Sequence, residues 1–115
     1  MNELDQLHCS QIKAGTSSLN ETEVSRLLAG LPGWQTYTKA GEPRLEKIYK
    51  FQDFNQAIAF TDQVARTAIA EDHHPAILTE YGKVTITWWT HAIKGLHQND
   101  FIMAAKTEQL FKKAV

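Results

Sequence analysis

The sequence predicts a single α+β domain, in which a four-stranded antiparallel sheet carries its helices on one face in the order α-β-β-α-β-β-α. Two observations predict this fold. Two pairs of short segments rich in aromatic and β-branched residues each surround a glycine-containing turn, near Gly41 and Gly82, as β-hairpins do. Segments with helical spacing lie before, between and after these pairs. Hairpins build antiparallel sheets, whose apolar face helices can cover.

The first helix is expected to begin after Asn20. Asn20 is a favoured N-cap residue, and Glu23 three positions later completes a capping box. The apolar residues that follow recur at helical spacing: Val24, Leu27, Leu28 and Leu31. Residues 1–18 show no sustained periodicity. We therefore predict a loosely ordered leader over residues 1–18 and one domain over residues 19–115.

The strands are predicted from their alternating and β-branched composition over residues 34–38, 45–51, 76–81 and 84–90. The first turn is expected at residues 40–43 and the second at Gly82-Lys83. On the last strand Val84, Ile86 and Trp88 share one face, because side chains alternate along a strand. We expect this face to pack against the helices.

Two further helices follow from caps and spacing. Asp53 is expected to cap a long helix that ends near Asp72, since Pro75 cannot continue it. A final helix is predicted from about residue 98 to residue 113. Its inward residues are expected to be Phe101, Ile102, Ala105 and Phe111.

Composition limits the function. The chain has 115 residues and a formal net charge of −1, from 12 basic and 13 acidic residues, which offers no broad basic surface for nucleic acid. No apolar run approaches the roughly 20 residues of a membrane span. The first residues lack the pattern of a signal peptide, so we expect a cytoplasmic protein. The single cysteine, Cys9, excludes an internal disulfide.

Histidines gather in one part of the chain. Four of the five fall within 25 consecutive positions: His73, His74, His91 and His97. His73 and His74 precede the third predicted strand, and His91 follows the fourth. If these strands form a hairpin, their outer ends meet and the three histidines converge there.

Three interpretations compete for this cluster. Three imidazoles can bind zinc, but His73 and His74 are adjacent and tend to diverge in an extended segment. Each histidine can also be structural, paired at the end of its own element. The third interpretation is acid–base catalysis, for which histidine is suited because its ordinary pKa, about 6.5, lies near neutral pH.

The spacing of these residues resembles that of the pterin-4a-carbinolamine dehydratase family across nearly all of residues 19–115. The family signature is His-His-Pro, an aromatic residue after five positions, a histidine after nine more and an aspartate after eight or more. The matching residues here are His73, His74, Pro75, Tyr81, His91 and Asp100. The segments Leu31-Pro32-Gly33-Trp34 and Gly95-Leu96 also look like the family.

The resemblance implies dehydration of a 4a-hydroxytetrahydropterin by histidine acid–base catalysis, with no metal and no organic cofactor. It implies catalytic roles for His73, His74 and His91, and leaves open whether His73 or His91 is the acid. It also implies that the pterin contacts His73, His74, His91 and two further residues that shape the pocket, Pro75 and Thr90.

Three supporting residues have two interpretations each. Asp100 near the start of the last helix is either an N-terminal charge favoured by the helix dipole or a residue that orients a histidine. Tyr81 and Trp34 either stack on a pterin ring or belong to the core, as aromatic residues in strands usually do.

Two positions differ from the family pattern. The family usually has a polar residue four positions before the first histidine, where this chain has Ile69. Glu71 and Asp72 are alternative sources of a carboxylate. The family also tends to have Thr or Ser where this chain has His97, and Asn99 is the alternative cap for the last helix.

The resemblance further implies homodimers or homotetramers, and an aromatic amino-acid hydroxylase as the physiological partner that supplies the pterin. Two rival functions come from other classes. Members of the family are associated with transcription factors, so the chain is alternatively a protein-binding module that acts as a dimerisation cofactor or coactivator. A pterin-binding protein without turnover is the third interpretation.

Overall fold

The computed structural model describes residues 3–114 of the chain, so residues 1–2 of the predicted leader and residue 115 lie outside the described part. The main elements are α1 (Glu21–Leu28), β1 (Gln35–Lys39), β2 (Glu42–Lys50), α2 (Phe54–Glu71), β3 (Ala76–Glu80), β4 (Lys83–Trp88) and α3 (Gln98–Ala114). Two short 3₁₀ helices are η1 (Leu4–Gln6) and η2 (His91–Ile93). The predicted fold class and element order are confirmed.

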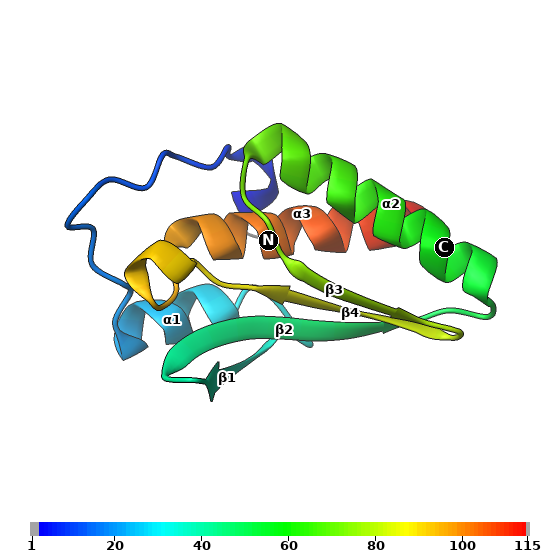
Figure 1. Cartoon of the computed structure of the whole chain (residues 1–115), viewed down its shortest axis with the longest axis horizontal. Coiled ribbons are helices and arrows are strands. Elements are labelled where there is room, and N and C mark those ends of the chain that lie inside the picture. Colours follow the sequence, from blue (N-terminus) through cyan, green and yellow to red (C-terminus); the bar gives the residue numbers. More distant parts are fainter. Residues whose placement is uncertain (1–2, 115) are drawn as a thin grey trace.

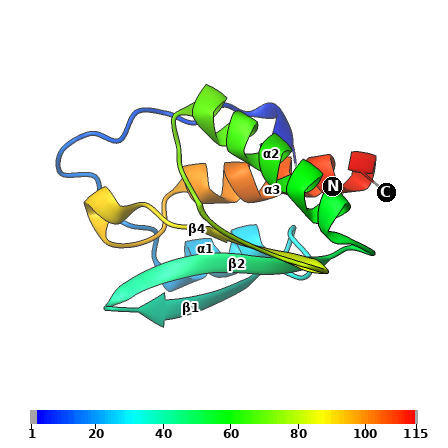
Figure 2. The ribbon, with the colours of Figure 1, turned by 45° about the vertical axis from the view of Figure 1, so that its right-hand side comes forward.

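One antiparallel sheet has the strand order β1-β2-β4-β3. The central strands β2 and β4 pair with Leu45 opposite Trp88, and β3 pairs with β4 with Ala76 opposite Thr87. Helices α2 and α3 lie side by side above one face of the sheet (Figures 1 and 2). The C-terminal end of α2 and the N-terminal end of α3 lie at the same end of the molecule as the start of β3 (Figure 1).

The core lies between the sheet and these helices. The side of β4 that was predicted to face inward is completely buried, with Val84, Ile86 and Trp88 each 0% exposed. From α3, Phe101 and Ile102 are buried in the same core. The predicted inward face of β4 is therefore confirmed, although Thr87 on the opposite face is also buried, at 5% exposed.

The predicted helix caps are largely confirmed. At α1 the Asn20 side chain accepts from the Glu23 N–H at 2.9 Å, and the Glu23 carboxylate accepts from the Asn20 N–H at 3.0 Å. At α2 the Asp53 carboxylate accepts from the Gln56 N–H at 2.8 Å. The Gln56 side chain accepts from the Gln52 N–H at 3.1 Å, so Asp53 and Gln56 do not form a complete capping box.

The first turn is tighter than predicted. Lys39 pairs with Glu42, so only Ala40 and Gly41 form the turn, and β2 begins at Glu42 instead of residue 45. Both turn residues have positive φ, 54° for Ala40 and 78° for Gly41, which is the geometry of a type I′ turn. In such a hairpin the closing pair, here Lys39 and Glu42, is hydrogen-bonded, and the next pair, Thr38 and Pro43, is not. This position therefore accommodates Pro43, which has no N–H to donate.

Ala40 is a strained choice for this turn, because its Cβ disfavours a positive φ and asparagine tolerates it. We expect Ala40→Asn to raise the free energy of unfolding by about 0.5–1 kcal/mol. Gly41→Ala should lower the free energy of unfolding by about 1 kcal/mol. The added Cβ has open space around it, but alanine disfavours the positive φ of this position. Urea unfolding measures both, and equal stabilities for the two variants would contradict the turn assignment.

The second turn lies one residue earlier than predicted. Glu80 pairs with Lys83, so the turn consists of Tyr81 and Gly82. Tyr81 is 72% exposed there. Because His73 lies before β3, Tyr81 and His73 are at opposite ends of this hairpin.

Residues 3–18, the described part of the predicted leader, make specific contacts with the rest of the domain. The Cys9 N–H donates to a Glu71 carboxylate oxygen at 2.7 Å, and His8 Nδ1 lies 2.7 Å from the other oxygen. Ser10 and the Asn99 side chain exchange two hydrogen bonds. These contacts use backbone groups and residues distant in sequence, so they leave no periodic signal.

Cys9 is unsuited to act as a nucleophile. Burial raises the pKa of its thiol to about 12, and the carboxylates of Glu71 and Asp100 act in the same direction. A protonated thiol is a poor nucleophile. We therefore assign Cys9 no chemical role.

Candidate active site

The candidate site is built around the carboxylate of Asp100, which is 0% exposed at the first turn of α3. One oxygen, Oδ1, lies 2.6 Å from His73 Nε2. The other, Oδ2, accepts from the Thr90 hydroxyl at 2.8 Å and from the His97 backbone N–H at 3.0 Å. The carboxylate thus holds together residues from three parts of the chain.

His73 is positioned by the end of α2. Asp72 adopts the left-handed conformation, with φ 52°, and the His73 N–H returns to the Ala68 carbonyl at 3.1 Å. The imidazole is buried and stacks on Trp88, with 5.9 Å between ring centroids and an interplanar angle of 10°. Helix end, core aromatic ring and carboxylate together fix the orientation of this histidine.

The hydrogen bonds to Asp100 imply a tautomer for His73. An ionised carboxylate only accepts hydrogen bonds, so Nε2 of His73 carries the proton that faces Asp100. The free nitrogen of His73 is then Nδ1. Both roles that the sequence left open for Asp100 therefore apply, because it lies at a helix N-terminus and also orients a histidine.

His74 and His91 lie beside this cluster and are exposed, with 66% and 80% of their side chains accessible. His74 Nε2 is 3.9 Å from an Asp72 carboxylate oxygen, which is too long for a hydrogen bond. His91 Nδ1 is 3.1 Å from Glu42 Oε1. His91 directly follows Thr90, so it is adjacent in the chain to a residue that Asp100 holds.

The structure therefore joins His73, Thr90 and Asp100 directly, and places His74 and His91 at their flanks. Pro75 is half-buried just before β3.

Two predicted supporting residues lie elsewhere. Tyr81 occupies the far turn of the β3–β4 hairpin. Trp34 is 4% exposed in the core, where its Nε1 donates to Glu108 at 3.2 Å and its ring packs edge-on against Tyr49. Of the two interpretations of Trp34, the structure supports the core residue.

Ile69, at the usually polar family position, is 71% exposed. Glu71 does not replace the missing polar group, because its carboxylate binds His8 and the Cys9 N–H. Burial of Glu71 raises its pKa, but these two hydrogen bonds and the charge of Lys106 outweigh burial and leave the pKa lowered. Asp72, whose side chain is 96% exposed, is the carboxylate near His74.

His97, and not Asn99, caps α3. His97 Nδ1 accepts from the Asn99 N–H at 3.0 Å, while the Asp100 carboxylate accepts from the His97 N–H. The Asn99 side chain binds the leader instead. An imidazole can therefore replace the Thr or Ser hydroxyl at this cap, provided that Nδ1 is not protonated.

This cap predicts a loss of stability in acid. Burial lowers the pKa of His97; Asp100 opposes this shift and His73 adds to it. The unfolded chain therefore takes up the proton first, near the ordinary value of about 6.5, and stability falls as pH decreases below that value. We expect His97→Thr, which keeps a cap oxygen, to weaken this dependence. If the free energy of unfolding changed by the same amount in both proteins between pH 7.5 and pH 5, this prediction would be contradicted.

Sequence reasoning missed two contacts beside the histidines. Glu42 is buried at the start of β2 and meets His91, as described above. The Arg44 guanidinium lies over the Trp89 ring, 3.9 Å from its centroid. Neither contact has a local sequence signal, since each joins residues more than 40 positions apart. Only the strand register could have suggested them.

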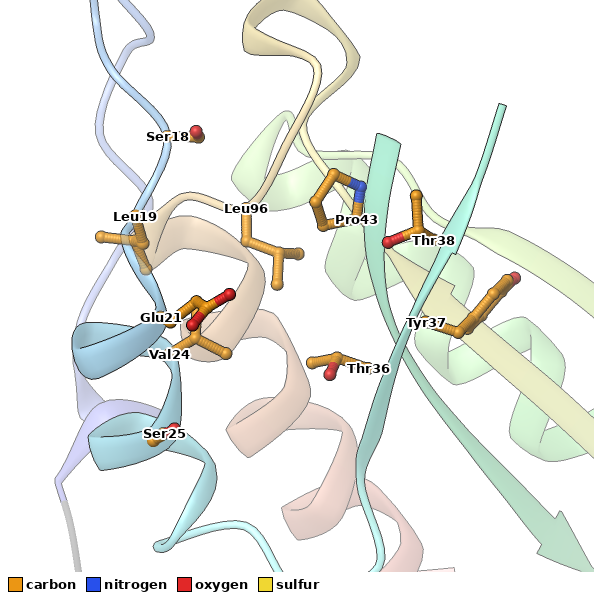
Figure 3. A pocket seen from close by; sticks show the side chains of 10 residues that line it. All are labelled: Ser18, Leu19, Glu21, Val24, Ser25, Thr36, Tyr37, Thr38, Pro43 and Leu96. Atoms are coloured by element: carbon orange, nitrogen blue, oxygen red, sulfur yellow. The ribbon is translucent and has the colours of Figure 1, made fainter. Parts of the chain in front are cut away.

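A separate hollow of about 440 Å³ lies between α1, β1 and the segment before α3 (Figure 3). Its polar lining is mostly hydroxyl groups, including Ser18, Ser25 and Thr36, with one carboxylate, Glu21. None of the clustered histidines lines it. The chemistry therefore favours the histidine cluster, and not this hollow, as the active site.

Within residues 3–114, no group of three or more His, Cys, Asp or Glu side chains is arranged to hold a metal ion. No helix within the same described range combines the length and apolarity that crossing a bilayer demands.

A family match and a 50% identical relative each cover most of the chain. The family described as pterin 4 alpha carbinolamine dehydratase matches residues 17–110. A Microcystis aeruginosa protein named "Putative pterin-4-alpha-carbinolamine dehydratase" is 50% identical over 113 residues, which cover 98% of this chain and 97% of that protein.

Two solved structures are also similar. A transcriptional coactivator/pterin dehydratase from Brucella melitensis is 34% identical with a TM-score of 0.74, over 82% of this chain and 98% of that chain. A pterin dehydratase-like protein identified as a RuBisCO assembly factor in the alpha-carboxysome is 25% identical with a TM-score of 0.58, over 68% and 88%. By the family match and the 50% identity, this chain belongs to the pterin 4 alpha carbinolamine dehydratase family.

Proposed function

We propose that the protein converts 4a-hydroxytetrahydropterins to quinonoid dihydropterins. The observation that carries the proposal is the buried hydrogen bond between His73 and Asp100, which orients an imidazole at the converging ends of β3 and β4. Two exposed histidines, His74 and His91, flank this pair. Family membership supplies the substrate class.

The reaction is an elimination of water. The C4a–O bond breaks, the leaving hydroxyl takes up a proton, and N5 loses one, so that the new double bond forms between N5 and C4a. One imidazole acts as the acid at oxygen and another as the base at nitrogen, and we assign these roles to His73 and His91. His74, Pro75 and Thr90 bind and shape the substrate site. No electrons are exchanged with a second molecule, so histidines suffice.

The test is the dehydration rate of freshly generated 4a-hydroxytetrahydropterin, followed by absorbance with and without the purified protein. We expect a large acceleration over the spontaneous rate. A folded protein that gives no acceleration would refute the proposal and would direct attention to Ile69, the position that departs from the family.

The same proposal includes the cellular setting. An aromatic amino-acid hydroxylase produces the 4a-hydroxypterin, so we propose such an enzyme as the source of substrate in the cytoplasm. We also propose that the chain forms homodimers or homotetramers. Light scattering of the purified protein measures the oligomeric state.

A protein-binding role is the second candidate, and one observation favours it. Three large apolar side chains of α2 are exposed: Phe54 at 45%, Ile58 at 46% and Ile69 at 71%. Exposed apolar groups on one helix are suited to contact another protein. A partner that still binds the His73→Ala/His91→Ala double variant, but not an Ile58→Ser/Ile69→Ser variant, would support this role.

A further inference from the structure

We propose that Glu42 is a positioning residue for His91, which it holds in the tautomer that carries hydrogen on Nδ1 and leaves Nε2 free for substrate. The proposal rests on the proposed dehydration, in which His91 transfers a proton. Glu42 lies outside the family signature, and its role follows from the contact between its carboxylate and the imidazole.

The two groups are well placed for this role. Glu42 Oε1 lies 3.1 Å from His91 Nδ1, although the residues are 49 positions apart. The carboxylate side chain is only 12% exposed, while the imidazole is 80% exposed. The carboxylate is therefore held in the protein, and the ring that it orients remains accessible to a small molecule.

Both partners are anchored through the backbone. Glu42 directly follows the two-residue turn at Ala40 and Gly41, and its register is fixed opposite Lys39. His91 directly follows Thr90, which forms a bridge with Gly95 and donates its hydroxyl to Asp100. The contact between Glu42 and His91 thus joins two segments that cannot shift freely.

The contact has a chemical consequence. A carboxylate accepts a hydrogen bond from the nearest imidazole nitrogen, so it favours hydrogen on Nδ1 of His91 and a lone pair on Nε2. Asp100 imposes the opposite arrangement on His73, where Nε2 is occupied. Each histidine proposed for proton transfer would therefore have one nitrogen on its own carboxylate and the other facing substrate, where the base presents a lone pair and the acid carries a second proton.

The test compares Glu42→Ala, Glu42→Gln and Glu42→Asp with Glu46→Gln as the matched control. Glu46 is a carboxylate on the same strand that accepts from Thr87 and does not contact His91. The first readout is the imidazole ¹⁵N spectrum of the substrate-free protein at alkaline pH, which reports which nitrogen of His91 carries hydrogen. We expect Nδ1–H in the wild type and in Glu46→Gln, and its loss in Glu42→Ala.

The second readout is kcat for dehydration. We expect Glu42→Ala to lower kcat by about 10- to 100-fold, the range typical when a partner that orients a histidine is removed. Glu42→Gln keeps an acceptor for Nδ1 and Glu42→Asp keeps the charge, so both should retain part of the rate. Glu46→Gln should leave kcat near the wild-type value.

The outcomes separate the two proposals. A wild-type His91 with hydrogen on Nε2, or a Glu42→Ala protein with full kcat while His91→Ala is inactive, overturns the positioning role. A tautomer that depends on Glu42 in a protein without any dehydratase activity supports the pairing and overturns the proposed reaction instead.

Discussion

Replacing His73 by alanine is expected to lower kcat for 4a-hydroxytetrahydropterin dehydration by about 10²- to 10⁴-fold, the usual contribution of a positioned acid or base. The imidazole is oriented by Asp100 and stacked on Trp88, and alanine removes the group proposed to transfer the proton. Stopped-flow absorbance of the substrate, corrected for the spontaneous rate, measures the effect.

His91→Ala should cause a loss of similar size, because the elimination needs an acid and a base together. His8→Ala is the matched control, since it removes an exposed imidazole that binds the Glu71 carboxylate and lies outside the site. Circular dichroism must show that all three variants are folded. A His73→Ala protein with the wild-type kcat would exclude His73 from proton transfer.

Asp100→Ala is expected to destabilise the fold by about 3–5 kcal/mol, the cost of removing one member of a buried polar cluster. The carboxylate is completely buried and accepts from three donors. Alanine would leave the His73 imidazole, the Thr90 hydroxyl and the His97 N–H without their acceptor. Urea unfolding monitored by tryptophan fluorescence measures the loss.

Two variants test whether this loss comes from the hydrogen bonds. Asp100→Asn keeps the size and one acceptor oxygen, so it should cost less than Asp100→Ala. Thr107→Val removes a buried hydroxyl on the same helix that donates to the Met103 carbonyl, and should cost at most about 1.5 kcal/mol. Equal losses for Asp100→Ala and Thr107→Val would contradict a central role for the Asp100 carboxylate.

Local patterns were sufficient to predict the elements of this fold. The cap at Asn20, the helix that ends before Pro75 and the alternation of Val84, Ile86 and Trp88 each depend on interactions within a few residues. The approximate positions of the two turns could be predicted, but their lengths could not. Gly41 marked the first one, but its length depends on which residues pair across the hairpin, and the pair of Lys39 with Glu42 made it shorter than expected.

The candidate site was likewise predicted only in part. The spacing of His73, His91 and Asp100 could be read in the sequence. The β3–β4 pairing places the segments that carry His73 and His91 at one end of the sheet, as the hairpin argument predicted, but that argument did not include Asp100. The hydrogen-bond partners of the carboxylates near the site could not be predicted from the sequence. That Glu71 binds the leader, and that Glu42 meets His91, depends on contacts across 62 and 49 positions.

The sequence by itself therefore determined the elements, the inward face of β4 and the residue types available for chemistry, because these depend on periodicity and on side-chain identity. Only the tertiary structure decided which carboxylate faces which imidazole. That choice depends on strand register and on the docking of α3 against α2. Neither is encoded in any short stretch of chain, since both result from packing the whole core at once.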